Sequence, residues 1–292
     1  MTGVDRSQPV WVIRTAMIDL PAFTSLHASL LDGDHVLHIS LDHGKANAMG
    51  STELRDWELL AGWLDTAPVR AVITSSHKTS SRGTPIFIAG ANVTERVEWS
   101  DTQVRAHVRW QRQILQAVRA APVFHIAVVN GVALGWGCEF MIACDYRIAV
   151  DGGARFALPE TGIGILPGAG GTSELWSLIG VPQAMRLGMT GEQIDAQEAL
   201  RIGLIQEVTA DVNTGLQRAR DLAAAVARRS PTSIAAFKRG ILQSVGRPPA
   251  VRAEIEAQAY ETCLDSGDAA IGRANFKAIT KGQSVDWNPR KL

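Results

Sequence analysis

The sequence has little of what marks several classes of protein. It contains three cysteines among 292 residues, and an odd number of scattered cysteines does not indicate a disulfide framework. Lysine plus arginine and aspartate plus glutamate each number 29, so the formal net charge is zero. A neutral chain has no strong positive field to attract nucleic acid or anionic lipid. We therefore expect neither nucleic acid nor a membrane surface as a partner.

Long apolar runs are also missing. No stretch approaches the ~18 apolar residues that a membrane-spanning helix needs, because Asn130 interrupts the run from Ile126 to Trp136. The first residues lack the basic start and apolar stretch of a secretion signal, and Asp5 and Asp19 argue against a transit peptide. A reducing cytoplasm is the expected location.

What remains is a composition typical of a globular protein, with 46% hydrophobic and 20% charged residues. Residues 1–24 show no sustained period and are interpreted as an irregular N-terminal extension. Strand and helix patterns alternate over residues 25–200, which predicts an α/β core. Residues 201–292 are almost wholly helical in pattern. The length is compatible with this division into a core and a helical C-terminal region.

Local signals place the main elements. A hairpin is predicted around Asp32-Gly33-Asp34, and Ser51 is the expected N-cap of the next helix. Buried strands are expected at 71–75, 86–90 and 125–130. A capping box is predicted from Asp195 and Glu198. The helices expected beyond it cover 212–229, 231–245, 249–264 and 269–279.

The glycine-rich string at 162–172 needs a test against phosphate-binding motifs. Reading G-x-G from Gly162 puts Pro167 at the third glycine, and reading from Gly168 puts Ser173 there. No lysine stands where a P-loop would need one. Cys138 and Cys144 do not form a common zinc spacing with His125, which we interpret as a core residue. Neither a nucleotide cofactor nor a metal is expected.

Two segments, 86–93 and 130–140, bring a buried strand to a turn of small residues before an expected helix. Backbone N–H groups at such turns are unpaired and lie at the positive end of a helix dipole. Two of them converging on one carbonyl oxygen would form an oxyanion hole. The alternative is that these glycines only permit close packing of the backbone.

Two glutamates accompany these turns. Glu139 lies in an otherwise apolar stretch, where a carboxylate is costly to bury, and Glu160 precedes the glycine-rich turn. A pair of glutamates beside a polarised carbonyl can hold one water and exchange protons with it. The structural alternatives are a helix N-terminal charge for Glu139 and a loop cap for Glu160.

Four blocks of sequence, in this order, closely resemble the crotonase, or enoyl-CoA hydratase/isomerase, superfamily. They are IFIAGANVTE (86–95), NGVALGWGCEFMIACDYRIA (130–149), RFALPETGIGILPGAGGT (155–172) and MTGEQIDAQEALRIGLIQEV (189–208). The resemblance extends over about residues 25–282. It implies a spiral of ββα units, a C-terminal helical region that mediates trimer formation, trimers often paired into hexamers, and acyl-CoA thioesters as substrates, with CoA as part of the substrate rather than a cofactor.

The resemblance also implies roles for individual residues. Ala91 and Trp136 match the two backbone oxyanion donors, and Glu139 and Glu160 match the paired catalytic glutamates of the hydratase branch. The remaining matches are to residues that contact CoA: Lys45, Ala46, Asn47, Ala89, Gly90 and, from the tail of a neighbouring subunit, Phe276 and Lys281.

Three departures from the family pattern concern the substrate more than the reaction. Trp136 stands where the family usually has glycine or alanine, and Asn92 replaces the usual aspartate after the first donor. The loop before residue 86 is several residues longer than usual. The leading hypothesis is syn addition of water to a 2-enoyl-CoA; the alternatives are double-bond isomerisation and a non-catalytic acyl-CoA-binding subunit whose site Trp136 has closed. The Trp136 side chain is predicted to line the acyl pocket.

Overall fold

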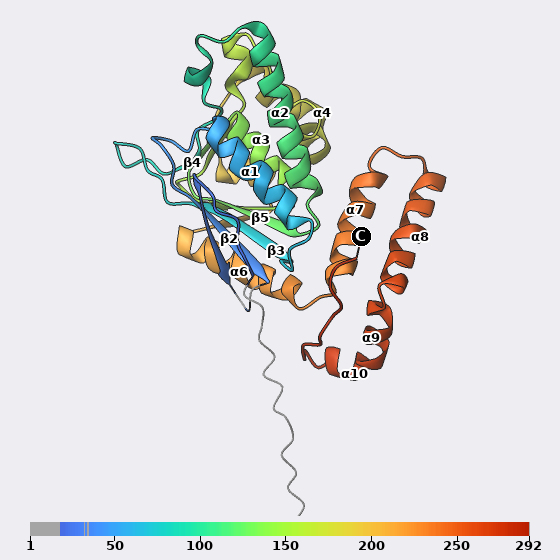
Figure 1. The fold of residues 1–292 in the computed structure, drawn as a ribbon. Coiled ribbons are helices and arrows are strands. Elements are labelled where there is room, and N and C mark those ends of the chain that lie inside the picture. The colour runs from blue at the N-terminus through green and yellow to red at the C-terminus, as the bar shows by residue number, and fades with distance from the viewer. Residues whose placement is uncertain (1–17, 32, 34, 292) are drawn as a thin grey trace, which may run out of the picture.

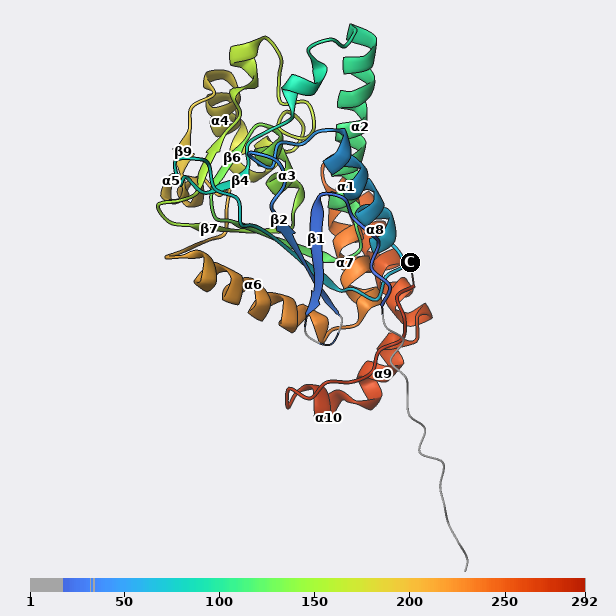
Figure 2. The ribbon, with the colours of Figure 1, turned by 60° about the vertical axis from the view of Figure 1, so that its left-hand side comes forward.

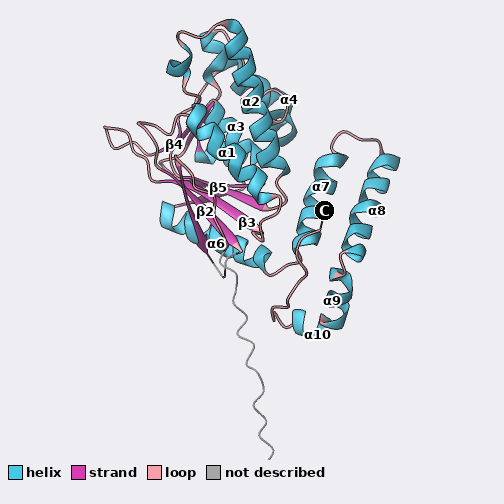
Figure 3. Ribbon diagram, in the orientation of Figure 1, coloured by secondary structure: helices cyan, strands magenta, loops and turns pink. Residues whose placement is uncertain are grey.

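The computed structural model describes residues 18–31, 33 and 35–291, and its strands form two sheets (Figures 1 and 3). The larger sheet has the order β1-β2-β3-β5-β7-β10 and the smaller one the order β4-β6-β8-β9. The strands of the larger sheet are β1 (Leu26–Leu31), β2 (Val36–Leu41), β3 (Ala71–Ser76), β5 (Phe124–Val129), β7 (Tyr146–Val150) and β10 (Glu207–Thr209). Those of the smaller sheet are β4 (Ile86–Ile88), β6 (Val132–Leu134), β8 (Arg155–Ala157) and β9 (Ile194–Asp195).

From β3 to β8, successive strands of the chain alternate between the two sheets. Strands β3, β5 and β7 lie in the larger sheet, and each is followed by its partner β4, β6 or β8 in the smaller one. Successive strands within each series pair in parallel, whereas β1 and β2 form an antiparallel hairpin. This repeated ββα winding confirms the predicted α/β spiral and the hairpin that opens it.

Helices cover both faces of the larger sheet (Figure 2). The helices of the core are α1 (Ser51–Leu64), α2 (Asp101–Ala120), α3 (Trp136–Ala143), α4 (Leu175–Thr190), α5 (Ala196–Arg201) and α6 (Val212–Ala227), with the 3₁₀ helices η1 (Val93–Arg96) and η2 (Pro159–Ile163). Helix α6 crosses one face, where Ala219, Ala223 and Ala227 pack among the strand residues. Their spacing of four residues puts these small side chains on one face of α6, so the helix can approach the sheet closely.

Helix α3 lies against β4 because of one glycine. A Cβ added to Gly137 would lie 2.2 Å from the carbonyl oxygen of Ile88, which no side chain could tolerate. This close approach brings the start of α3 beside the end of β4, and thus brings together the two turns that the sequence singles out.

Two predicted helix starts differ in detail. Helix α1 begins at Ser51 with Gly50 as its N-cap, so the prediction of Ser51 as N-cap is wrong by one residue. The Ser51 hydroxyl instead donates to Glu95, while Glu53 accepts from the Gly50 N–H. In α5, Asp195 accepts from the N–H of Glu198 as predicted, but the Glu198 carboxylate forms ion pairs with arginines rather than completing a capping box.

The C-terminal helices form an arm beside the core (Figure 1). They are α7 (Pro231–Ser244), α8 (Pro249–Asp265), α9 (Asp268–Ala274) and α10 (Phe276–Ile279). The Lys238 ammonium anchors the arm, because it lies 2.7 Å from the Asp145 carboxylate and 2.9 Å from the Val123 carbonyl oxygen. Large apolar side chains on the arm remain exposed, among them Phe237 and Tyr260.

The N-terminal extension predicted at 1–24 lies outside the described residues as far as residue 17, and residues 18–24 contain no helix or strand. Among the helices that the structure describes, none combines the length and the apolar character needed to cross a membrane.

Candidate active site

A cavity of about 220 Å³ lies where the turns after β4 and β6 meet. Its wall includes Ala91, Trp136, Glu139 and Glu160, so all four residues predicted to take part in the reaction border one space. Helix η2 and the inner face of α2 complete the wall. The topology explains this meeting, because parallel strands β4 and β6 end at the same edge of their sheet.

The turn after β4 leaves one backbone donor unused. The carbonyl of Gly90 accepts from the Met49 N–H at 2.9 Å, and the Asn92 N–H donates to the Met49 carbonyl at 2.8 Å. Between them, the N–H of Ala91 takes part in none of the hydrogen bonds found among the described residues. Gly90 has φ +102°, a conformation that side chains resist, and it lets the turn present this N–H to the cavity.

The turn after β6 leaves a second backbone N–H group without a hydrogen-bond partner among the described residues. Gly135 has φ +50°, and its own N–H donates to the Ala157 carbonyl at 2.9 Å. The N–H of the next residue, Trp136, is the first of helix α3 and has no partner within the described chain. A Cβ at Gly135 would lie 2.6 Å from Glu160 Oε1, so this glycine provides both the turn and room for the carboxylate.

The Trp136 side chain is more deeply packed than the sequence predicts. The residue borders the cavity, but its side chain is only 2% exposed and belongs to the hydrophobic core. Its ring stacks on Phe140 at 5.7 Å between centroids with an interplanar angle of 23°. Its indole Nε1 is buried and has no hydrogen-bond partner among the described residues.

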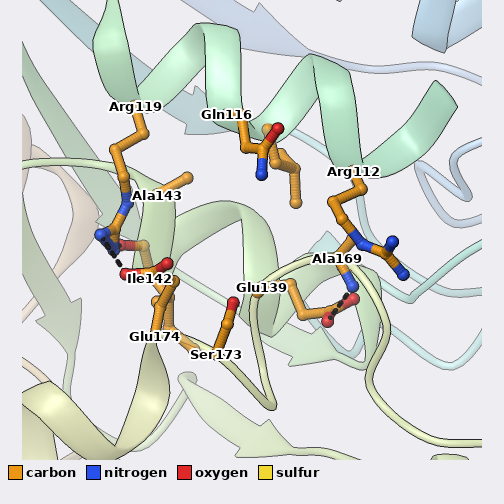
Figure 4. Close-up of a pocket in the computed structure, with 11 residues that line it drawn as sticks. Arg112, Gln116, Arg119, Glu139, Ile142, Ala143, Ala169, Ser173 and Glu174 are labelled. Atoms are coloured by element: carbon orange, nitrogen blue, oxygen red, sulfur yellow. Dashed lines mark hydrogen bonds and ion pairs between the residues drawn. The ribbon is translucent and has the colours of Figure 1, made fainter. Parts of the chain in front are cut away.

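Glu139 lies in the first turn of α3, and a short loop fixes its carboxylate (Figure 4). Its Oε1 accepts from the N–H of Ala169 at 2.7 Å and from the N–H of Gly171 at 2.9 Å. Burial raises the pKa of this carboxyl group, while the two backbone donors and the positive charge of Arg112 oppose the rise. The carboxylate is therefore both buried and oriented.

Glu160 is held differently. It follows Pro159 in η2, and its Oε2 is buried without a hydrogen-bond partner in the described structure. Its pKa is raised to about 7, mainly by burial and in part by the negative charge of Glu139, against a backbone hydrogen bond that lowers it. Near neutral pH this carboxyl group is thus divided between the protonated and ionised forms.

The predicted CoA-contacting loop is tied to the end of β4. Ala89 donates its N–H to the Ala46 carbonyl at 3.1 Å. The Asn47 side chain is buried and fully engaged: its Nδ2 donates to Ser76 and to the Phe87 carbonyl, and its Oδ1 accepts a backbone N–H. Lys45 is exposed at the loop surface. The loop is thus fixed beside the turn that follows β4.

The two C-terminal residues predicted to contact CoA do not reach this cavity in the same chain. Phe276 begins α10 and is 66% exposed, and Lys281 follows that helix. Figures 1 and 2 place α10 at the end of the arm, away from η1 and α4. Their predicted partner is the CoA of a neighbouring subunit, which a single chain does not test.

Two polar residues of the cavity wall were missed from the sequence: Arg96, at the end of η1, and Gln111, on α2. A signal for Gln111 was present, because it shares the spacing of the buried face of α2 with His107, Ile114 and Leu115. Arg96 carried no such signal, since it lies in a 3₁₀ helix of only four residues.

The other candidates remain structural. His125 is buried, its ring lies 2.8 Å from the Thr74 hydroxyl, and burial lowers its pKa to about 3, as expected of a neutral core residue. Burial raises the thiol pKa of Cys138 and Cys144, which are both unpaired. Within the described ranges no group of three histidine, cysteine or acidic residues could hold a metal ion.

Comparison with known proteins identifies the family. The model of the enoyl-CoA hydratase/isomerase family matches residues 33–284. The chain belongs to this family. A short-chain-enoyl-CoA hydratase of Clostridium acetobutylicum is 32% identical over 232 residues, which cover 79% of this chain and 86% of that protein. An enoyl-CoA isomerase/hydratase of Mycosarcoma maydis is 36% identical over 184 residues, or 63% of this chain and 67% of that protein.

The fold agrees with solved structures of the family. An enoyl-CoA hydratase from Bacillus anthracis superposes with a TM-score of 0.82 at 31% identity, covering 91% of this chain and all of that one. The crotonase fold predicted from the sequence is therefore confirmed, and the chain is an enzyme of a family that acts on enoyl-CoA thioesters.

Proposed function

We propose that this enzyme is an enoyl-CoA hydratase, a hydro-lyase that adds water reversibly, and on one face, across the double bond of a 2-enoyl-CoA. The observation that carries the proposal is the convergence of two unpaired backbone donors and two glutamates on one cavity. Each feature alone has a structural explanation, but together they supply every group that hydration requires.

The donors polarise the thioester. The N–H groups of Ala91 and Trp136 bind the carbonyl oxygen, which gains negative charge as an enolate forms. Such preorganised donors contribute ~3 to 4 kcal/mol each to a developing oxyanion. Because the Trp136 N–H is at the N-terminus of α3, the helix dipole favours the same charge.

Each glutamate carries out one proton transfer, and its surroundings determine which one. Glu139, oriented by two N–H donors, accepts a proton from water as its oxygen bonds to C3. Glu160, with a pKa near 7, is available in its protonated form and delivers a proton to C2. The product is the 3-hydroxyacyl thioester, and transfer of the proton from Glu139 back to Glu160 restores the enzyme.

The rest of the CoA is proposed to lie along the loop that carries Lys45 and Ala46, which the structure fixes beside Ala89 and Gly90. We further propose that the chain forms homotrimers, or dimers of trimers. The exposed apolar side chains of the arm and of α4 support this assembly: Phe237, Ile241, Tyr260, Phe276, Trp176, Met185 and Met189.

Hydration is tested by incubating the enzyme with crotonyl-CoA. We expect loss of the absorbance of the conjugated thioester and formation of 3-hydroxybutyryl-CoA, identified by mass. Migration of the double bond of a longer enoyl-CoA, with no gain of water, would instead support an isomerase. Binding without turnover of any enoyl-CoA would support an acyl-CoA-binding subunit.

A further inference from the structure

The wall of the cavity carries hydrogen-bond donors that have no partner. Arg96 Nε and Nη2, Gln111 Nε2 and Trp136 Nε1 are all buried without a hydrogen bond in the described structure, and all three residues border the same cavity as the glutamates. The side chains of Gln111 and Trp136 are deeply buried, since the two residues are only 4% and 2% exposed. Buried donors without partners are rare because each costs free energy, so four such atoms on three residues around one space indicate a ligand that accepts their hydrogen bonds.

The negative charge of Glu95 acts on Arg96, but Arg96 Nε and Nη2 have no hydrogen-bond partner in the described structure. Glu95 is adjacent in sequence, but its carboxylate accepts from the N–H and the hydroxyl of Ser51 and so faces α1. The other titratable neighbour is His107, whose ring packs against Trp99 and whose pKa is lowered by burial and by the Arg96 charge. A neutral histidine adds no opposing charge, so Arg96 has no hydrogen-bonded acidic partner among the described residues.

Arg96 and Gln111 belong to a different part of the wall from the reacting groups. The oxyanion donors and glutamates come from the turn after β4, from α3 and from η2, whereas Arg96 ends η1 and Gln111 lies on α2. The wall also includes the apolar side chains of Val93, Val108 and Leu166. A purely aliphatic acyl chain would be accommodated by the apolar side chains but would leave the charged and amide donors buried and unpaired.

We propose that the acyl group of the natural substrate ends in a carboxylate, which Arg96 and Gln111 bind. The substrate class is thus a CoA monothioester of a short unsaturated dicarboxylic acid. A carboxylate accepts hydrogen bonds at both oxygens, so it can use an Arg96 donor and the Gln111 amide together, and it brings a negative charge to the half-buried guanidinium. This inference rests on the proposed hydratase function, because it assumes that the acyl group occupies this cavity.

The test compares two substrates of equal chain length, 2-hexenedioyl-CoA and 2-hexenoyl-CoA, which differ only in the terminal carboxylate. We expect the unmodified enzyme to favour the carboxylated substrate at least ~10-fold in kcat/KM. Replacement of Arg96 by Met should lower kcat/KM for that substrate by about 10- to 100-fold more than for the uncharged substrate, the usual range for a lost hydrogen bond to a charged group. Arg96→Lys should restore part of the preference.

Two further variants keep the test decisive. Gln111→Leu should weaken the same preference without changing any charge. Arg105→Met removes an exposed arginine from the same helix as Gln111 and should not alter the ratio between the two substrates. Equal loss of both substrates in Arg96→Met, or an equal change in Arg105→Met, would overturn the assignment of Arg96 to the carboxylate.

Measurements of binding affinity test this inference independently of the proposed reaction. Saturated adipyl-CoA and hexanoyl-CoA cannot be hydrated, so their affinities, measured by calorimetry, report recognition alone. Tighter binding of adipyl-CoA, lost in Arg96→Met, would support the carboxylate site even if no enoyl-CoA were turned over. Equal binding of both, or a preference for hexanoyl-CoA, would contradict it even if crotonyl-CoA were hydrated rapidly.

Discussion

The two parts of the cavity wall are built in different ways. At the reacting end, backbone turns at Gly90 and Gly135 set the position of the donors, and side chains matter mainly through the two glutamates. Along η1 and α2, the backbone is regular and the chemistry lies in the side chains of Arg96 and Gln111. In the proposed function, the backbone therefore determines the class of reaction, whereas a few side chains select the acyl group.

The largest effect should come from the glutamates, which define the reacting end. Single Glu139→Gln and Glu160→Gln changes preserve size and remove basicity, so each should lower kcat by at least ~100-fold. The double variant should be little worse than the worse single one, because both groups serve one step. Steady-state hydration assays check this, with Glu98→Gln on the exposed surface as a control. Near-normal hydration by either single variant would remove that glutamate from the mechanism.

The next largest effect tests the backbone donor. Ala91→Pro removes the N–H, which should cost ~3 to 4 kcal/mol of transition-state stabilisation. Ala91→Gly retains the N–H and should remain active, which separates loss of the donor from loss of the side chain. Hydration rates for both, together with circular dichroism to confirm folding, decide the matter. A folded Ala91→Pro enzyme with full activity would place the oxyanion elsewhere.

A smaller effect is expected at Trp136, which belongs to both parts of the comparison. Its N–H serves the reacting end, whereas its indole packs on Phe140 and carries an unpaired Nε1. Trp136→Gly should therefore reduce stability and also change the ranking of acyl groups, by roughly 10- to 200-fold at most for a change in pocket shape. Values of kcat/KM for C4, C8 and cinnamoyl thioesters check the second effect. An unchanged ranking with a lower melting temperature would make the indole purely structural.

The smallest effect concerns the pH dependence of stability. The pKa of Glu160 is raised to about 7 from its ordinary value of 4.5, so between these values the folded protein keeps a proton that the unfolded chain has released. This contribution to stability is present below about pH 4.5 and is lost as the pH rises through 7. Glu160→Gln should thus be more stable than the unmodified protein at pH 8, by ~1 to 2 kcal/mol after allowance for its partial exposure.

Urea unfolding at pH 5 and pH 8 measures this difference directly. The gain in stability from Glu160→Gln should be larger at pH 8 than at pH 5. A gain that is the same at both values would mean that the carboxyl group titrates normally.

Much of this site could be predicted from the sequence, for reasons that lie in particular residues. Glu139 was recognisable because a carboxylate within an apolar helix needs partners, and the structure supplies two N–H groups from the loop at Ala169 and Gly171. The oxyanion turns were recognisable because small residues follow buried strands. Both signals are local in the sequence, so they can be recognised without knowledge of the fold.

What could not be predicted depends on distant contacts. The deep packing of Trp136 follows from Phe140 one helical turn later and from the surrounding core, neither of which the local pattern specifies. The position of Arg96 follows from a short 3₁₀ helix, for which the sequence has no strong signal. Gly50 replaces Ser51 as N-cap because the Ser51 hydroxyl donates a hydrogen bond to Glu95, a residue 44 positions away.

The most direct test of the central claim, that the paired glutamates add water to an activated enoyl thioester, is hydration in water enriched in oxygen-18. We expect crotonyl-CoA to give 3-hydroxybutyryl-CoA that carries one heavy oxygen at C3, and both Glu139→Gln and Glu160→Gln to form this product at least ~100-fold more slowly. Unlabelled product, or labelled product formed at the normal rate by either variant, would contradict the account.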